Sequence, residues 1–236
     1  MLQLPKKRRH FLKVTGVMSL LIIAFISAGR SEQSDNKKVI KTQTEKKAEQ
    51  QAKTEKAIFA GGCFWCVESD FDKVKGVIKT ISGYTGGITK NPTYKEVTYK
   101  NTGHFEAVEI TYDPSIVSYK ELLHIFWRTI DPTDAGGQFC DRGASYRTAI
   151  FPINDEQFKL ATESKAHEQT KGKLKGKIVT PVLKSTMFYK AENYHQNYYK
   201  TNPIRYNYYR FSCGRDKKIK KLWGEEAHMG LQKATH

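Results

Sequence analysis

The sequence predicts a single α/β (α+β) domain in which helices pack on a mixed sheet, with a long irregular C-terminal segment. Short apolar runs typical of strands alternate with stretches of helical periodicity, and some of these runs follow each other with no helix between them. The chain has 236 residues, which is enough to bury a core, and its four cysteines are too few for a disulfide scaffold.

The first half of the domain is expected to open with a short buried strand over 57–60 that stops at two glycines. A helix follows over 63–73, and a second strand over 77–84. Glycines and an Asn-Pro pair then predict a loop over 85–92. Residues 104–112 alternate between apolar and polar side chains, which predicts a half-buried strand.

The second half is expected to continue the same alternation. Turn residues at 113–118 precede apolar residues at helical spacing as far as Ile130, which predicts a helix there. The further expected elements are a strand over 146–151, a surface helix over 155–171, strands over 179–183 and 185–189, a helix over 191–199 and a solvated basic helix over 215–221. In the surface helix we expect Phe158, Leu160 and Ala161 to face inward.

The N-terminal region is typical of an export signal. A basic stretch over 6–9 precedes an apolar stretch over 14–28, so residues 1–29 are interpreted as a signal peptide or signal anchor. The apolar stretch is shorter than the ~20 residues of a membrane span, which favours cleavage without deciding it. Arg8-Arg9 resembles a twin-arginine signal, and both export routes stay open. We therefore expect a periplasmic protein, or a membrane-anchored one that faces outside the cytoplasm.

The remaining boundaries follow from composition. Residues 30–56 contain almost no large apolar side chains and predict a disordered polar linker. The folded domain is expected over 57–225, with a C-terminal tail over 226–236. The net charge is +16, but the dense basic runs lie near the two ends and no zinc-finger spacing occurs. We therefore expect no nucleic-acid partner.

Cys63 is the first candidate for chemistry. It follows two glycines and opens a predicted helix, where free backbone N–H groups and the helix dipole favour a thiolate. A buried structural cysteine is the alternative. Cys66 completes a C-x-x-C motif, which indicates a redox pair or half of a metal site. No second C-x-x-C follows, so we expect no zinc.

Beyond these residues, the sequence resembles the peptide methionine sulfoxide reductases of the A type. The segment 61–68 looks like the signature of that family, and six further blocks appear in the family's order between about Ile58 and Trp223. The signature and blocks are GGCFWCVE (61–68), SGYTGG (82–87), NPTY (91–94), TGHFEAV (102–108), FWR with DPT (126–133), DRG with YRT (141–148) and AENYHQ (191–196).

The resemblance implies a role for each polar residue of the site. The thiolate of Cys63 would attack the sulfoxide sulfur. Glu106 would protonate the sulfoxide oxygen, which requires a pKa raised by burial; from its position alone it would be an exposed strand residue. Tyr94 and Tyr146 would donate hydrogen bonds to that oxygen, and Asp141 would help to shape the polar shell.

The resemblance also implies an apolar side and a stereochemical preference. Phe64 and Trp65 would form the wall that takes the substrate methyl group. The S epimer of methionine sulfoxide, in proteins and free, would be reduced, and the R epimer would not. His195 is expected to be structural rather than catalytic.

Turnover would leave a sulfenic acid on Cys63 that condenses with a second thiol. We favour Cys213 as this resolving cysteine, with Cys66 as the alternative, and we interpret Cys140 as a bystander. A thioredoxin-like dithiol would then reduce the disulfide. No metal or organic cofactor is implied, and we expect a monomer.

Two other functions stay open. A general thiol–disulfide oxidoreductase that uses Cys63 and Cys66 would not need Glu106. An exported basic binding protein with structural cysteines would keep its function when Cys63 becomes serine. Neither accounts for the order in which Tyr94, Glu106, Asp141 and Tyr146 occur.

Overall fold

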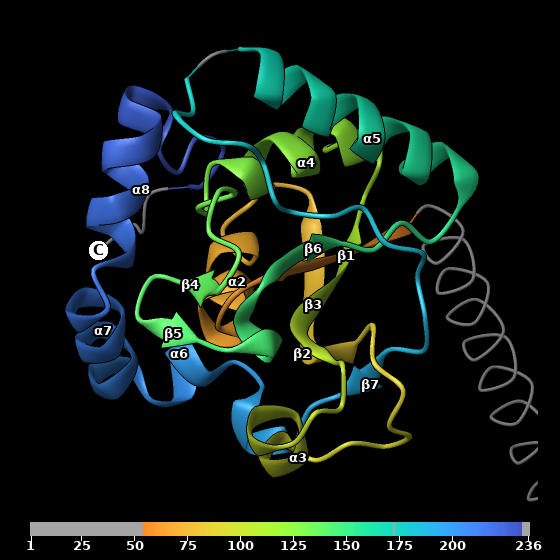
Figure 1. Ribbon diagram of the computed structural model, residues 1–236, viewed down its shortest axis with the longest axis vertical. Helices are drawn as coiled ribbons and strands as arrows, with labels where there is room; N and C mark the ends of the chain where they lie inside the picture. Colours follow the sequence, from red (N-terminus) through yellow and green to blue (C-terminus); the bar gives the residue numbers. More distant parts are fainter. Residues whose placement is uncertain (1–53, 172, 233–236) are drawn as a thin grey trace, which may run out of the picture. The chain divides into compact units, whose positions relative to one another are not determined.

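The computed structural model describes residues 54–171 and 173–232, which form an α/β domain around one sheet (Figure 1). The strands are β1 (Glu55–Gly61), β2 (Val77–Thr85), β3 (Phe105–Tyr112), β4 (Gly137–Gln138), β5 (Asp141–Arg142), β6 (Thr148–Ile150) and β7 (Tyr189–Lys190). The helices are α2 (Phe64–Phe71), α3 (Tyr94–Tyr99), α4 (Tyr119–Trp127), α5 (Asp155–Thr170), α6 (Tyr198–Thr201), α7 (Pro203–Ser212) and α8 (Arg215–Trp223). Single 3₁₀ turns occupy Ala144–Tyr146, Asn193–His195 and Gly224–Glu226.

The sheet has the strand order β6-β1-β3-β2-β7. All four of its ladders are antiparallel, whereas we expected a mixed sheet. The parallel component is a single bridge between Ile150 and Val182, since the segment after α5 pairs with β6 at one point. The remaining strands, β4 and β5, form a separate two-stranded hairpin.

The two faces of the sheet bury different clusters because successive strand residues point to opposite sides. On the larger side, α2 and α4 cover the face that carries Phe59, Val108 and Ile110. Phe59 stacks on Phe126 of α4 with ring centroids 4.9 Å apart. The opposite face carries Phe105 and a smaller apolar cluster. Glu106 has the same parity as Val108 and Ile110, so its side chain is directed towards α2.

Two helices begin at capping boxes. In α4, the Ser118 side chain accepts a hydrogen bond from the Glu121 backbone N–H while Glu121 bonds back to Ser118. The same reciprocal arrangement at Thr93 and Glu96 starts α3, inside a region where we expected no helix. This helix was missed because it is short and buries only Val97, so it carries no apolar periodicity.

Several expected elements differ from the structure. Phe158 is 49 % exposed rather than inward-facing, because α5 rests on the domain through Gln157, Ala161 and Glu168. The expected strands over 179–189 reduce to the Val182 bridge and the start of β7. The expected helix over 191–199 is a 3₁₀ turn followed by the start of α6.

The C-terminal part is more regular than expected, since it contains α7 and α8 (Figure 1). The basic helix α8 was predicted, but its Trp223 is buried and donates a hydrogen bond from Nε1 to the Ile130 carbonyl at 3.0 Å. Part of the expected tail also packs on the domain: Glu226 accepts hydrogen bonds from the buried Arg128, and Leu231 forms a bridge with Val74.

The expected export signal (1–29) and residues 30–53 of the expected linker lie outside the described residues. They stay predictions. The last linker residues belong to the fold, since β1 begins at Glu55. Among the residues that the structure describes, no helix is long and apolar enough to cross a membrane.

Candidate active site

The site begins at the turn between β1 and α2. Gly62 has a φ of +84°, and a Cβ built there would lie 2.5 Å from the Cβ of Gln138. A side chain at this position would therefore be strained and would clash. Arg215 of α8 braces the same turn, because its buried guanidinium donates two hydrogen bonds of 3.2 Å to the Gly61 carbonyl. Cys63 follows as the N-cap of α2.

A small cavity of about 80 Å³ lies in front of this thiol. It is lined by Cys63, Phe64, Trp65, Tyr94, Glu106, Asp141, Tyr146 and Tyr209. The cavity thus brings together the predicted nucleophile, the predicted acid, both predicted tyrosines, Asp141 and the aromatic pair. Cys66 and Cys213, the two candidate resolving cysteines, do not line it. Tyr209 was not predicted, since nothing in its sequence context marks it.

Glu106 is 1 % exposed, so the interpretation of an exposed strand residue from position alone is wrong. Its Oε2 accepts a hydrogen bond of 2.9 Å from the backbone N–H of Phe64, which fixes the carboxyl beside the nucleophile. Burial raises the pKa of Glu106 well above its usual range, although the Phe64 N–H opposes this shift. Burial therefore favours the protonated form of this carboxyl, the form that can donate a proton.

Tyr94 and Tyr146 form the donor pair. They come from α3 and from the 3₁₀ turn before β6, and their hydroxyl oxygens lie 3.5 Å apart. Glu192 holds the start of α3 in place by accepting a hydrogen bond of 2.8 Å from the Tyr94 backbone N–H. Burial raises the pKa of both phenols, so both keep their protons at physiological pH. Each can donate a hydrogen bond into the cavity.

The apolar side consists of Phe64 and Trp65. Trp65 stacks on Tyr198 of α6 with centroids 3.7 Å apart. Its Nε1 donates a hydrogen bond of 3.0 Å to Nδ1 of His195. Burial lowers the pKa of His195, which keeps the imidazole neutral and able to accept that bond. His195 therefore contacts the aromatic wall from behind and does not line the cavity.

The two thiols of the C-x-x-C motif are both free, buried and hydrogen-bonded to each other. We expected a lowered pKa for Cys63. Instead, burial, the Cys66 thiol and the carboxyls of Glu106 and Asp141 raise the pKa of Cys63 well above its usual range. The hydrogen bond from Cys63, together with the charges of Arg215 and Arg210, lowers the pKa of Cys66 to about 7. Cys66 is therefore the thiol of this pair whose surroundings lower its pKa.

The other two cysteines form a disulfide. Cys140 and Cys213 are joined although they lie 73 residues apart, so the interpretation of Cys140 as a bystander is wrong. Sequence offered one cue, the position of Cys140 directly before Asp141. These two sulfurs and the Asp141 carboxylate are the one group of potential metal ligands among the described residues. Both sulfurs are engaged in the disulfide.

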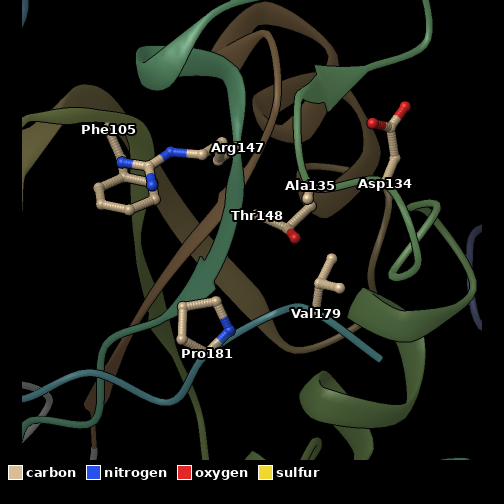
Figure 2. A pocket seen from close by; sticks show the side chains of 7 residues that line it. All are labelled: Phe105, Asp134, Ala135, Arg147, Thr148, Val179 and Pro181. Atoms are coloured by element: carbon tan, nitrogen blue, oxygen red, sulfur yellow. The ribbon is translucent and has the colours of Figure 1, made fainter. Parts of the chain in front are cut away.

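A second hollow of about 140 Å³ lies beside β6 (Figure 2). The Arg147 guanidinium lies 4.8 Å from the centre of the Phe105 ring, and Thr148 and Pro181 complete the lining together with three further residues. None of the lining residues is a cysteine. This hollow therefore places no thiol beside a bound molecule.

An α/β domain whose buried thiol faces a buried carboxyl and two phenols is a cysteine-dependent enzyme. The family model described as peptide methionine sulfoxide reductase matches residues 55–227. The chain belongs to this family, as its motifs indicated.

Similar proteins agree with this assignment. The chain is 55 % identical over 172 residues to the peptide methionine sulfoxide reductase MsrA of Bacillus subtilis, covering 73 % of this chain and 97 % of that protein. It is 53 % identical over 174 residues to the MsrA of Bacillus licheniformis, covering 74 % and 96 %. Among solved structures, methionine sulfoxide reductase A of Corynebacterium diphtheriae has a TM-score of 0.60 and 37 % identity over 64 % of this chain and 76 % of that chain. The α/β fold class is thereby confirmed.

Proposed function

We propose that this protein reduces the S epimer of methionine sulfoxide, in proteins and free, to methionine, and so repairs oxidative damage. One observation carries the proposal. A free thiol, a buried carboxyl whose pKa is raised by burial and two phenol hydroxyls share one small cavity with an aromatic wall. A sulfoxide needs this combination, because its sulfur accepts a nucleophile, its oxygen accepts protons and its methyl group is apolar.

In the first step, the sulfur of Cys63 attacks the sulfoxide sulfur. Glu106 supplies a proton to the sulfoxide oxygen and takes up the proton that the Cys63 thiol releases, while Tyr94 and Tyr146 donate hydrogen bonds to the oxygen. The S–O bond of the substrate breaks and its oxygen is transferred to Cys63. Methionine leaves in reduced form and Cys63 is oxidised to a sulfenic acid. Asp141 helps to orient these donors, while Phe64 and Trp65 receive the methyl group.

In the second step, we propose Cys66 rather than Cys213 as the resolving thiol. Cys66 is hydrogen-bonded to Cys63, whereas Cys213 is already bonded to Cys140. The lowered pKa of Cys66 supplies the thiolate that attacks the sulfenic sulfur. A Cys63–Cys66 disulfide forms and water leaves.

Cys66→Ser is expected to form one equivalent of methionine in a single turnover and to stop at the Cys63 sulfenic acid, because no adjacent thiol remains to condense with it. Trapping with a sulfenic-acid reagent and peptide mass mapping would measure the product. Cys213→Ser is the comparison variant and is expected to form the Cys63–Cys66 disulfide after each turnover, since it keeps both of these thiols. A disulfide between Cys63 and Cys213 in the wild type would contradict this assignment.

The disulfide must be reduced before another turnover, and its reduction requires two electrons and two protons. We propose a thioredoxin-like dithiol protein as the donor, which becomes a disulfide as Cys63 and Cys66 return to thiols. Because residues 1–29 predict export, this donor is proposed to act outside the cytoplasm.

The decisive experiment is an assay of the full chain on a blocked peptide that contains stereochemically pure methionine sulfoxide, with dithiothreitol as reductant. We expect turnover of the S epimer and none of the R epimer. Equal rates on the two epimers would contradict the stereochemical proposal. If folded protein reduced neither epimer but reduced disulfides rapidly, a general thiol–disulfide oxidoreductase would replace the proposed function.

A further inference from the structure

Tyr209 lines the cavity but has no part in the steps described above. It belongs to α7, and its hydroxyl donates a hydrogen bond to Oδ2 of Asp141. Its ring lies edge-on to Trp65, with centroids 5.9 Å apart and an interplanar angle of 84°. Tyr209 therefore connects the polar wall of the cavity with the apolar wall.

The Cys140–Cys213 disulfide joins the two segments that carry Asp141 and Tyr209. Cys140 directly precedes Asp141, and Cys213 lies one helical turn after Tyr209, with its N–H donating to the Tyr209 carbonyl at 2.9 Å. The disulfide thus ties the strand that carries Asp141 to the helix that carries Tyr209, with Cα atoms 5.0 Å apart. Cys140 is exposed while the Tyr209–Asp141 contact is half-buried, so the bond lies at the rim of the cavity.

The hydrogen bond from the Tyr209 hydroxyl affects both the orientation and the pKa of the Asp141 carboxyl. This carboxyl is half-buried, and it faces Glu106 of β3, Cys63 at the start of α2, Tyr209 of α7 and Arg215 of α8. Burial raises its pKa, while the Tyr209 hydroxyl and the Arg215 charge lower it. Removing the hydroxyl would leave Asp141 free to rotate and would shift its titration to higher pH.

We propose that Tyr209 is a positioning residue for the sulfoxide reductase reaction and that the Cys140–Cys213 disulfide holds it against Asp141. The proposal rests on the proposed function. Tyr209 acts through Asp141 and Trp65, which face the substrate from the two sides of the cavity. The disulfide acts through Tyr209, since it fixes the spacing between α7 and β5.

The test is a single-turnover assay without reductant, because dithiothreitol would also open the Cys140–Cys213 bond. Full-length protein carrying two titratable thiols, Cys63 and Cys66, is mixed with one equivalent of S-sulfoxide peptide, and methionine formation is followed by rapid quench. The variants are Tyr209→Phe, the pair Cys140→Ser/Cys213→Ser, and the combination of all three. Tyr208→Phe is the matched control, since Tyr208 neighbours Tyr209 on α7 and is 74 % exposed.

Tyr209→Phe is expected to slow methionine formation about tenfold, the size of effect that a hydrogen bond to a charged group supports. It is also expected to move the Asp141 limb of the pH–rate profile to higher pH. The serine pair is expected to show a similar loss of rate. Adding Tyr209→Phe to it should change the rate little further, because both changes disrupt the same contact between Tyr209 and Asp141. Tyr208→Phe should match the wild type.

An unchanged rate and pH profile in Tyr209→Phe would overturn the positioning role. A serine pair that melts at lower temperature but keeps the wild-type rate would show that the disulfide only stabilises the fold. If the serine pair does not fold, wild-type protein reduced to four titratable thiols gives the same comparison. Failure of the wild type itself to reduce any sulfoxide would instead refute the proposed function.

Discussion

Cys63→Ser is expected to abolish sulfoxide reduction, lowering the rate by about 10⁴-fold or more. A serine hydroxyl is a poor nucleophile towards sulfur at neutral pH, and it cannot take up the sulfoxide oxygen as a sulfenic acid. Chromatographic measurement of methionine formed from the S-sulfoxide peptide would test this expectation, in single turnover and with dithiothreitol.

The matched control is Cys66→Ser, which changes the neighbouring thiol by the same atom and is expected to keep the first step. Both variants should have circular dichroism spectra and melting temperatures close to the wild type, because serine is nearly isosteric with cysteine. Substantial methionine formation by folded Cys63→Ser would mean that another group is the nucleophile.

Glu106→Gln is expected to lower the rate of methionine formation at least about 100-fold, the usual contribution of a positioned general acid. Glutamine has the same shape, and its side-chain oxygen can still accept the hydrogen bond from the Phe64 N–H. The amide has no acidic proton to transfer. Rates from single-turnover experiments would isolate this step from the later reduction of the disulfide.

The pH dependence gives a second readout for Glu106. An acid catalyst acts while it is protonated, and burial raises the pKa of this carboxyl. The wild-type rate should therefore persist through neutral pH and fall as pH rises through the raised pKa. In Glu106→Gln that limb should disappear. Rates within about twofold of the wild type would show that water or a phenol supplies the proton.

The position of the nucleophile could be predicted from local sequence, because the strand, the two glycines and the helix start are contiguous around Cys63. The pKa of this thiol could not be predicted from local sequence. The helix N-terminus favours a thiolate, but burial by distant segments raises the pKa of Cys63, and the carboxyls of Glu106 and Asp141 raise it further. Neither this burial nor these charges can be read from the residues next to Cys63 in sequence.

The sequence pattern of β3 does not indicate that Glu106 is buried. Phe105 and Ala107 point to one face of β3, whereas Val108 and Ile110 point to the other, so apolar residues do not mark a single buried side. Only the structure shows that α2 covers the face of the sheet to which Glu106 points. Without the resemblance to a family, its role would have been overlooked.

Contacts across long sequence separations were the least predictable. Tyr209 reaches the cavity because α7 packs beside the hairpin that carries Asp141, and neither the short hairpin nor this helix docking has a sequence signature. The pairing of Cys140 with Cys213 depends on the same docking. By contrast, the aromatic pair Phe64 and Trp65 could be placed, since both are adjacent to Cys63.

The brace that Arg215 provides at the Gly61 carbonyl has a consequence for biosynthesis. The nucleophile lies near the start of the domain, but the group that completes its turn lies 154 residues later in the chain. In a growing chain Cys63 leaves the ribosome long before α8, so the hydrogen bonds from Arg215 to the Gly61 carbonyl can form only after that helix has docked. A product that terminates before α8 would therefore carry the cysteine without the Arg215 brace at its turn.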